Sequence, residues 1–112
     1  MLKKVYRLKG DDIKEFFKNR DFSKKENFNF LILFKKNQLN HPRFAAKPLV
    51  KIFKKAVERN RIKRRIYSII ENEIKSGFNI NKDFIIFVKN KEILTKNYND
   101  LKKELMELIK NV

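Results

Sequence analysis

The apolar residues of this chain follow two spacings, one typical of helices and one typical of strands. Ile13, Phe16 and Phe17 fall at i, i+3 and i+4, which predicts a short helix over about residues 11–19. Leucine and isoleucine recur at helical spacing through residues 97–112, which predicts an amphipathic helix at that end. Both segments have one apolar side, so each needs a partner surface to cover it.

Three shorter runs have the composition of strands. Residues 28–35 (FNFLILFK) and residues 83–89 (DFIIFVK) are rich in aromatic and branched side chains, which predicts two buried strands. Residues 43–50 contain a third apolar run that is interrupted by Pro48. Because proline cannot donate a ladder hydrogen bond, this run predicts a strand with a sheet edge or a strand end near Pro48.

A long helix is predicted from about Ile52 to about Lys75, and Gly77 follows it where a helix C-cap is expected. At about 100° per residue, one side of this helix carries only isoleucine. We expect that stripe to pack on the sheet; its members are Ile62, Ile66, Ile69, Ile70 and Ile74.

The order of these elements predicts an α+β fold in which helices pack on one sheet. We expect a single domain over residues 1–112, because a chain of 112 residues seldom contains two. Residues 1–10 are basic and poorly patterned, and we expect them to form a flexible arm.

The formal charge of +16 at pH 7 favours a polyanionic partner. No apolar stretch approaches the roughly 20 residues that span a bilayer, so no membrane partner is expected. The chain has no cysteine, which fits a cytoplasmic protein. Its one histidine, His41, lies in a polar stretch, and no nucleophile–histidine pair or metal-ligand spacing is recognisable. We therefore expect neither catalytic residues nor metal ligands in the polypeptide.

The cations concentrate in residues 54–65 (KKAVERNRIKRR), where Glu58 is the one acid and four of the chain's seven arginines occur. On the predicted helix, Arg61, Arg64 and Arg65 face away from the isoleucine stripe, whereas Arg59 and Lys63 flank it. Guanidinium groups suit bidentate phosphate contacts and stacking on bases. A merely solvated helix and a membrane-surface helix are alternatives, but the first does not need this arginine density and the second needs an exposed apolar face.

This segment closely resembles the signature of the bacterial ribonuclease P protein family, an arginine–asparagine–arginine motif within a pattern close to KAVxRNRxKRR. The early "RLK" of Arg7 to Lys9 and the two strand-like runs extend the resemblance over nearly the whole chain. Two departures occur: Lys54 stands where the family often has glycine, and Ile13 stands where the family often has an aromatic residue, unless Phe16 takes that place.

The resemblance implies an α-β-β-β-α-β-α order with one mixed sheet and an unusual left-handed βαβ crossover. It also implies a protein subunit that binds ribonuclease P RNA and the 5′ leader of precursor tRNA, while the RNA and its Mg²⁺ remove the leader. Two groups of site residues follow from it. The RNA-binding group is Lys51, Lys54, Lys55, Arg59, Asn60, Arg61, Lys63, Arg64 and Arg65, and the leader-cleft group is Ile13, Phe16, Phe17 and Phe34.

Two other hypotheses fit the charge and the size. The first is a structural RNA-binding protein, such as a small ribosomal protein. Only the motif separates this hypothesis from that of a ribonuclease P subunit. A sequence-specific DNA binder would place the long helix in a major groove, but no dimerisation helix is recognisable, so no DNA partner is expected.

Overall fold

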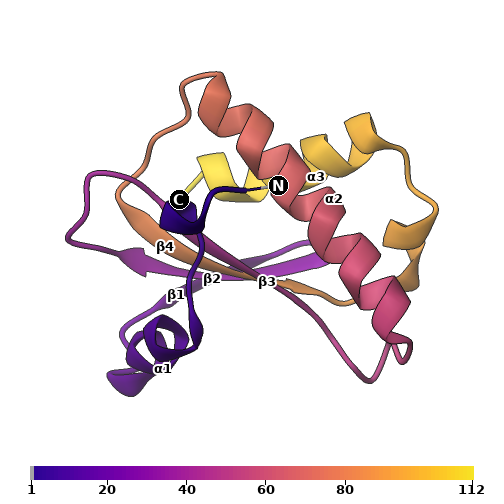
Figure 1. Ribbon diagram of the computed structural model, residues 1–112, viewed down its shortest axis with the longest axis horizontal. Coiled ribbons are helices and arrows are strands. Elements are labelled where there is room, and N and C mark those ends of the chain that lie inside the picture. The colour runs from indigo at the N-terminus through magenta and orange to yellow at the C-terminus, as the bar shows by residue number, and fades with distance from the viewer. Residues whose placement is uncertain (1) are drawn as a thin grey trace.

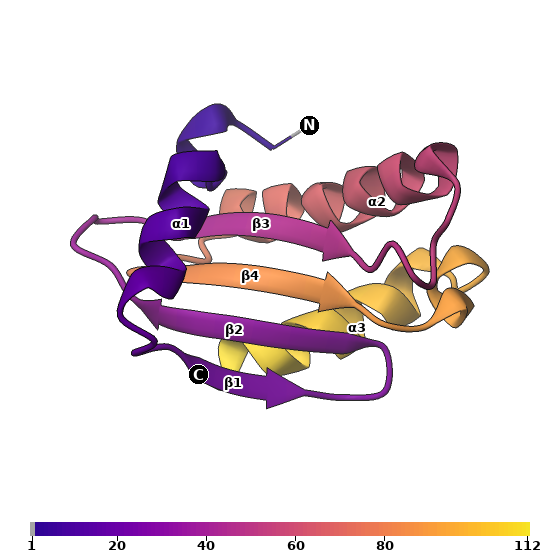
Figure 2. The same cartoon turned by 90° about the horizontal axis from the view of Figure 1, so that it is seen from below.

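The computed structural model describes residues 2–112 and contains a four-stranded mixed sheet with helices on both faces (Figures 1 and 2). The strand order is β1-β2-β4-β3; β2 is antiparallel to β1 and β4, whereas β3 is parallel to β4. In chain order, the helices and strands are α1 (Gly10–Lys18), β1 (Ser23–Glu26), β2 (Phe30–Lys36), β3 (Arg43–Pro48), α2 (Ala56–Lys75), β4 (Lys82–Val88) and α3 (Tyr98–Lys110). This arrangement confirms the predicted α+β class and element order.

The two faces of the sheet bury separate clusters. The larger cluster joins α2 and α3 to one face, and it includes Phe44, Phe84 and Ile86. The smaller cluster joins α1 to the other face through Phe16, Leu33 and neighbouring residues. Figure 2 shows α1 crossing the near face of the strands while α2 and α3 lie behind them.

The parallel pair β3 and β4 is connected through α2. In Figure 2 both strands point the same way and the connecting helix lies behind the sheet, which gives the crossover a left-handed sense. About 98% of such crossovers are right-handed, so this connection is the uncommon one that the family resemblance implied. Strand β3 is an edge strand that ends at Pro48, as the missing proline donor predicted.

Helix α2 begins at Ala56 rather than near Ile52, because Ile52 and Phe53 lie in the preceding turn, where both backbone N–H groups donate to the carbonyl of Leu49. The helix ends as predicted. Gly77 has φ 102, and the N–H of Phe78 donates to the carbonyl of Glu73 at 3.0 Å, which is the pattern of a Schellman C-cap.

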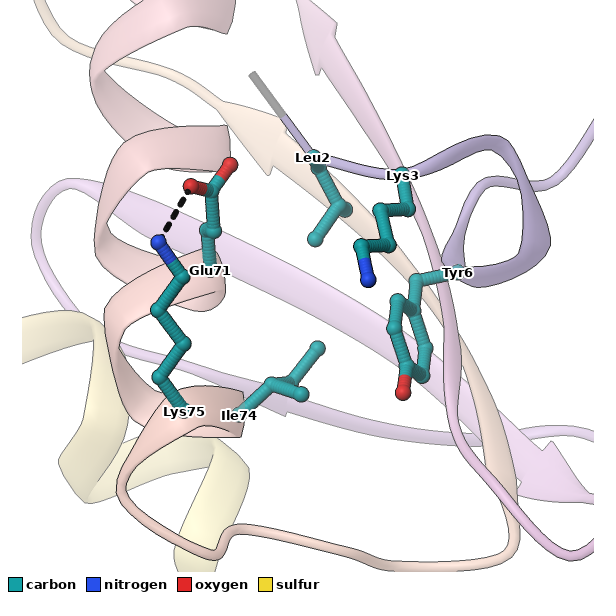
Figure 3. A pocket seen from close by; sticks show the side chains of 6 residues that line it. All are labelled: Leu2, Lys3, Tyr6, Glu71, Ile74 and Lys75. Atoms are coloured by element: carbon teal, nitrogen blue, oxygen red, sulfur yellow. Dashed lines mark ion pairs between the residues drawn. The ribbon is translucent and has the colours of Figure 1, made fainter.

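The N-terminal segment is packed rather than a free arm. Leu2 is 2% exposed and Leu8 is 7% exposed, and the N–H of Leu8 donates to the carbonyl of Phe44 at 2.9 Å. Figure 3 shows Leu2 and Tyr6 beside Ile74 of α2, around a small pocket. The expectation of a flexible arm was wrong for residues 2–9, because two leucines among the lysines supply apolar anchors; Met1 lies outside the described residues.

Candidate nucleic-acid interface

The cations of α2 owe their position to the side chains on the opposite side of the helix. Ile62, Ile66, Ile69 and Ile70 are at most 1% exposed and pack on the sheet, and Ile74 is partly buried at the margin. The predicted stripe is therefore confirmed. Its burial turns Asn60, Arg61 and Arg64 toward solvent, where all three are exposed.

We call these exposed residues, together with the lysines that lead into the helix, the cationic ridge. Its members are Lys51, Lys54, Lys55, Asn60, Arg61 and Arg64, all exposed. In the described part of the chain, the ion pairs join acids to other cations. The ridge thus presents charge that the protein does not neutralise, and a polyanion would do so.

Arg59 has a structural contact at the start of the ridge. Its guanidinium donates to the carbonyl of Phe53 at 2.8 Å and to the carbonyl of Lys54 at 3.0 Å. These bonds fix the turn between β3 and α2, and they hold the lysines of that turn beside the helix. Arg59 was predicted to flank the apolar stripe, and it does so while it is partly buried.

Arg65 was expected to face outward, but it turns toward a neighbouring segment of the chain. Its guanidinium donates to the carbonyls of Ile93 and Lys96, the first at 2.7 Å, and so ties α2 to the short helix Lys91–Leu94. Partial burial lowers the pKa of Arg65, and the nearby charge of Arg61 lowers that pKa further. At about 100° per residue, Arg65 lies only about 60° from Ile62, so its grouping with the outward-facing arginines was wrong. A long side chain from that side of the helix can reach a neighbouring backbone.

A hollow lies along the seam between the ridge and the N-terminal segment. It is lined by Arg7, Asn60, Lys63, Arg64 and Tyr67. The Tyr67 hydroxyl accepts a hydrogen bond from the N–H of Ala46 at 3.1 Å, which fixes the ring against β3. Sequence reasoning placed Lys63 at this seam but missed Arg7 and Tyr67; the "RLK" match was the available signal for Arg7.

The residues of the predicted leader-cleft group lie on both faces of the sheet. Phe16 is 1% exposed, Ile13 is partly buried, and Phe17 is 38% exposed, all on the α1 side. Phe34 belongs to the cluster under α2 and α3, where its ring lies 6.3 Å from that of Phe84. The prediction that Phe34 shares a cleft with the α1 residues was therefore wrong, because alternation along a strand does not say which side meets which helix.

Three aromatic rings form a compact group at the C-terminal end of α1. Phe16 stacks on Phe22 with ring centroids 5.4 Å apart, and Phe17 meets the edges of both. Lys35 of β2 donates to the carbonyl of Phe16 at 3.1 Å and pairs with Asp21 at 3.3 Å. The partly exposed ring of Phe17 is therefore held in a fixed position.

The opposite end of α1 is held by a charge network. Arg43 of β3 binds Asp83 through two hydrogen bonds of 3.0 and 2.8 Å, and it also contacts Asp12 of α1 at 3.1 Å. The bonds to Asp83 raise the pKa of Arg43, and Asn37 donates to the same carboxylate at 2.9 Å. The orientation of α1 across the sheet is thus set at both of its ends.

Neither a metal centre nor a membrane span is recognisable within residues 2–112. No group of three histidine, cysteine or acidic side chains is arranged there to hold a metal ion. In the same part of the chain, no helix combines the length and the apolar character needed to cross a membrane.

The fold and the cationic ridge define a class, the small α+β proteins with an exposed basic helix on one face of the sheet. A family model described as Ribonuclease P matches residues 2–112. The chain is 37% identical over 87 residues, 78% of each sequence, to the ribonuclease P protein component of Mycoplasma mycoides subsp. mycoides SC. It is 36% identical over the same length to that of Mycoplasma capricolum subsp. capricolum, again with 78% of each covered.

Solved structures of bacterial ribonuclease P proteins have the same fold. The ribonuclease P protein of Thermotoga maritima matches with a TM-score of 0.78 at 25% identity, over 95% of this chain and 94% of that one. The Staphylococcus aureus protein matches in fold with a TM-score of 0.74 at 21% identity, over 94% and 93% of the two chains. The chain belongs to the ribonuclease P protein family. It is thus a subunit of the holoenzyme that processes tRNA 5′ ends and works with ribonuclease P RNA, rather than a ribosomal protein or a DNA binder.

Neighbouring arginines on α2 should differ in what they stabilise. Arg65→Ala should lower the free energy of unfolding by about 1–3 kcal/mol, because it removes charge-assisted bonds to two backbone carbonyls. Arg64→Ala, one residue away and exposed, should change it by less than about 0.5 kcal/mol. Urea unfolding of the free protein measures both, and equal losses would contradict the assignment of Arg65 to the fold.

Proposed function

We propose that the cationic ridge docks on the phosphates of ribonuclease P RNA. The observation that carries this proposal is the pair Arg61 and Arg64, which the buried isoleucine stripe turns outward and which no acid of residues 2–112 neutralises. Their forked heads suit bidentate phosphate contacts. Lys51, Lys54, Lys55 and Asn60 extend the same exposed surface, and Lys63 reaches it through the seam hollow.

Arg59 and Arg65 support this surface and contribute charge at its margin. Arg59 holds the turn that carries three of the lysines, and Arg65 fixes the short helix beside α2. A preformed ridge does not need to order these elements when RNA binds, so less binding energy is lost to conformational entropy.

We propose that the α1 face receives the single-stranded 5′ leader of precursor tRNA. Phe17 offers a partly exposed, fixed ring, and Ile13 is partly buried on the same helix. Single strands are held by aromatic rings on which bases stack, together with cations along the backbone. Phe16 supports the Phe17 ring from the core, and Phe34, on the other side of the sheet, takes no part.

The bond cleavage itself belongs to the RNA partner in this proposal. In this proposal the Mg²⁺ that hydrolysis requires is held mainly by the RNA subunit. The polypeptide contributes affinity and orientation, which act by placing the leader and the RNA in one productive geometry. The complex would act in the cytoplasm, where precursor tRNA is processed.

Reconstitution tests the proposal as a whole. The purified protein, added to a bacterial ribonuclease P RNA at low Mg²⁺, should stimulate removal of the leader from precursor tRNA, because its cations replace part of the screening that Mg²⁺ supplies. The measurement is the rate of leader release with and without protein. The absence of stimulation at every Mg²⁺ concentration would contradict the proposal.

Arg64→Ala should weaken binding to ribonuclease P RNA by about 1 kcal/mol or more and flatten the dependence of log affinity on log salt by about one unit. Filter binding over a series of salt concentrations measures both quantities. Lys103→Ala is the control, because Lys103 is an exposed cation of α3 outside the ridge. If the two variants lose the same affinity and slope, the ridge is not the docking surface.

Phe17→Ala should reduce holoenzyme affinity for a precursor tRNA with a leader by about 1–3 kcal/mol, the usual effect of losing one stacking ring. Affinity for mature tRNA, which has no leader, should not change. Phe17→Leu is the matched control for apolar volume, and it should retain stability without the stacking. Equal losses for both RNAs would assign Phe17 to the fold or to the RNA subunit instead.

A further inference from the structure

One residue of the leader-binding face has an unusual backbone. Arg20 has φ 51, and it is the one residue other than glycine with a positive φ in the described chain. It follows Asn19, the C-cap of α1, and so occupies the position just beyond the helix, where glycine is preferred because it lacks a Cβ. Any side chain with a Cβ strains the backbone there.

The corresponding position after α2 is occupied by glycine. Gly77 has φ 102 and follows the C-cap Ser76, so a positive φ occurs just beyond two helices of this chain, once at arginine and once at glycine. Folding does not explain the arginine. Arg20 is exposed, and it takes part in none of the ion pairs or side-chain hydrogen bonds found within residues 2–112.

Aromatic rings and a lysine lie near Arg20, and these are the residue types that hold single strands. Arg20 lies between Phe17 and Phe22 in sequence, and those two rings meet edge to face with centroids 5.4 Å apart. Lys35 fixes the same turn through the carbonyl of Phe16 and the carboxylate of Asp21. Arg20 is therefore exposed on a turn whose neighbouring residues are held in place, three residues from Phe17, which is 38% exposed.

We propose that Arg20 binds a phosphate of the 5′ leader next to the base that stacks on Phe17. This inference rests on the proposed leader-binding face and adds a residue to it. Guanidinium suits the task because its planar fork donates two parallel hydrogen bonds to a phosphate. The leader is the expected source of that phosphate because α1 and the cationic ridge lie on opposite sides of the sheet (Figures 1 and 2).

The test uses Arg20→Gly, because that change relieves the backbone while it removes the cation. For the free protein, the midpoint of thermal unfolding should rise by roughly 2–6 °C, as expected for relief of a strained position in a domain of this size. For the holoenzyme, affinity for a precursor tRNA with a leader should fall about 3-fold to 10-fold, and its salt dependence should flatten by about one unit. Affinity for mature tRNA should not change.

Arg20→Lys is the matched control. It retains both the positive charge and the strained Cβ, so its unfolding midpoint should equal that of the original protein, and its leader affinity should lie between those of the other two. A loss of binding that is accompanied by a loss of stability would indicate a structural role, whereas the proposal requires the two effects to have opposite signs.

Three results would overturn the inference: unchanged leader affinity in Arg20→Gly, an equal loss for mature tRNA, or a lower unfolding midpoint. Phe17→Ala, measured beside it, separates this failure from that of the leader-binding face. If Phe17→Ala discriminates between the two RNAs and Arg20→Gly does not, only the role of Arg20 is wrong. If neither variant discriminates, the leader-binding face itself is wrong.

Discussion

The burial of four isoleucines between α2 and the sheet is the constraint on which the rest of this structure depends. Each fully buried aliphatic side chain contributes roughly 1.5–3 kcal/mol, and Ile62, Ile66, Ile69 and Ile70 are all at most 1% exposed. Self-repulsion at a charge of +16 opposes a compact state. The stripe offsets that repulsion and also fixes the rotation of α2, so the exposure of Arg61 and Arg64 is a consequence of core packing.

The same constraint divides the clustered arginines by role. Those opposite the stripe have no protein partner to reach, whereas those near its margins lie close to backbone carbonyls at the two ends of the helix–sheet seam. Arg59 binds the carbonyls before the helix, and Arg65 binds those of the next short helix. The sequence motif groups Arg59, Arg61, Arg64 and Arg65 together. In the structure, two of them bind backbone carbonyls, whereas Arg61 and Arg64 are exposed to solvent.

Sequence patterns predicted the parts of the fold in which burial is strong. β2 and β4 are nearly continuous apolar runs, and α2 has a helical stripe, so each was found within a few residues of its observed bounds. β1 was missed because Ser23–Glu26 is a polar edge strand with little burial, and its pairing with β2 alone defines it. Phe34 and the N-terminal segment were misplaced for a related reason, since side-chain spacing describes one element and not the element that covers it. The candidate site followed the same division: the exposed ridge was predictable, whereas Arg7 and Tyr67 join it only through the tertiary structure.

A single sheet separates the two surfaces assigned to RNA. The ridge lies on the side of α2, the aromatic group lies on the side of α1, and the strands between them are held by one continuous ladder from β1 to β3. The charge network of Asp12, Arg43 and Asp83 fixes α1 to this ladder, and the isoleucine stripe fixes α2 to it. Because neither helix can rotate without breaking buried contacts, the distance and angle between the two surfaces are set before any RNA binds. A rigid spacer of this kind can position one strand relative to another without contributing any group to the reaction, which is the form of assistance expected from a polypeptide whose partner supplies the chemistry.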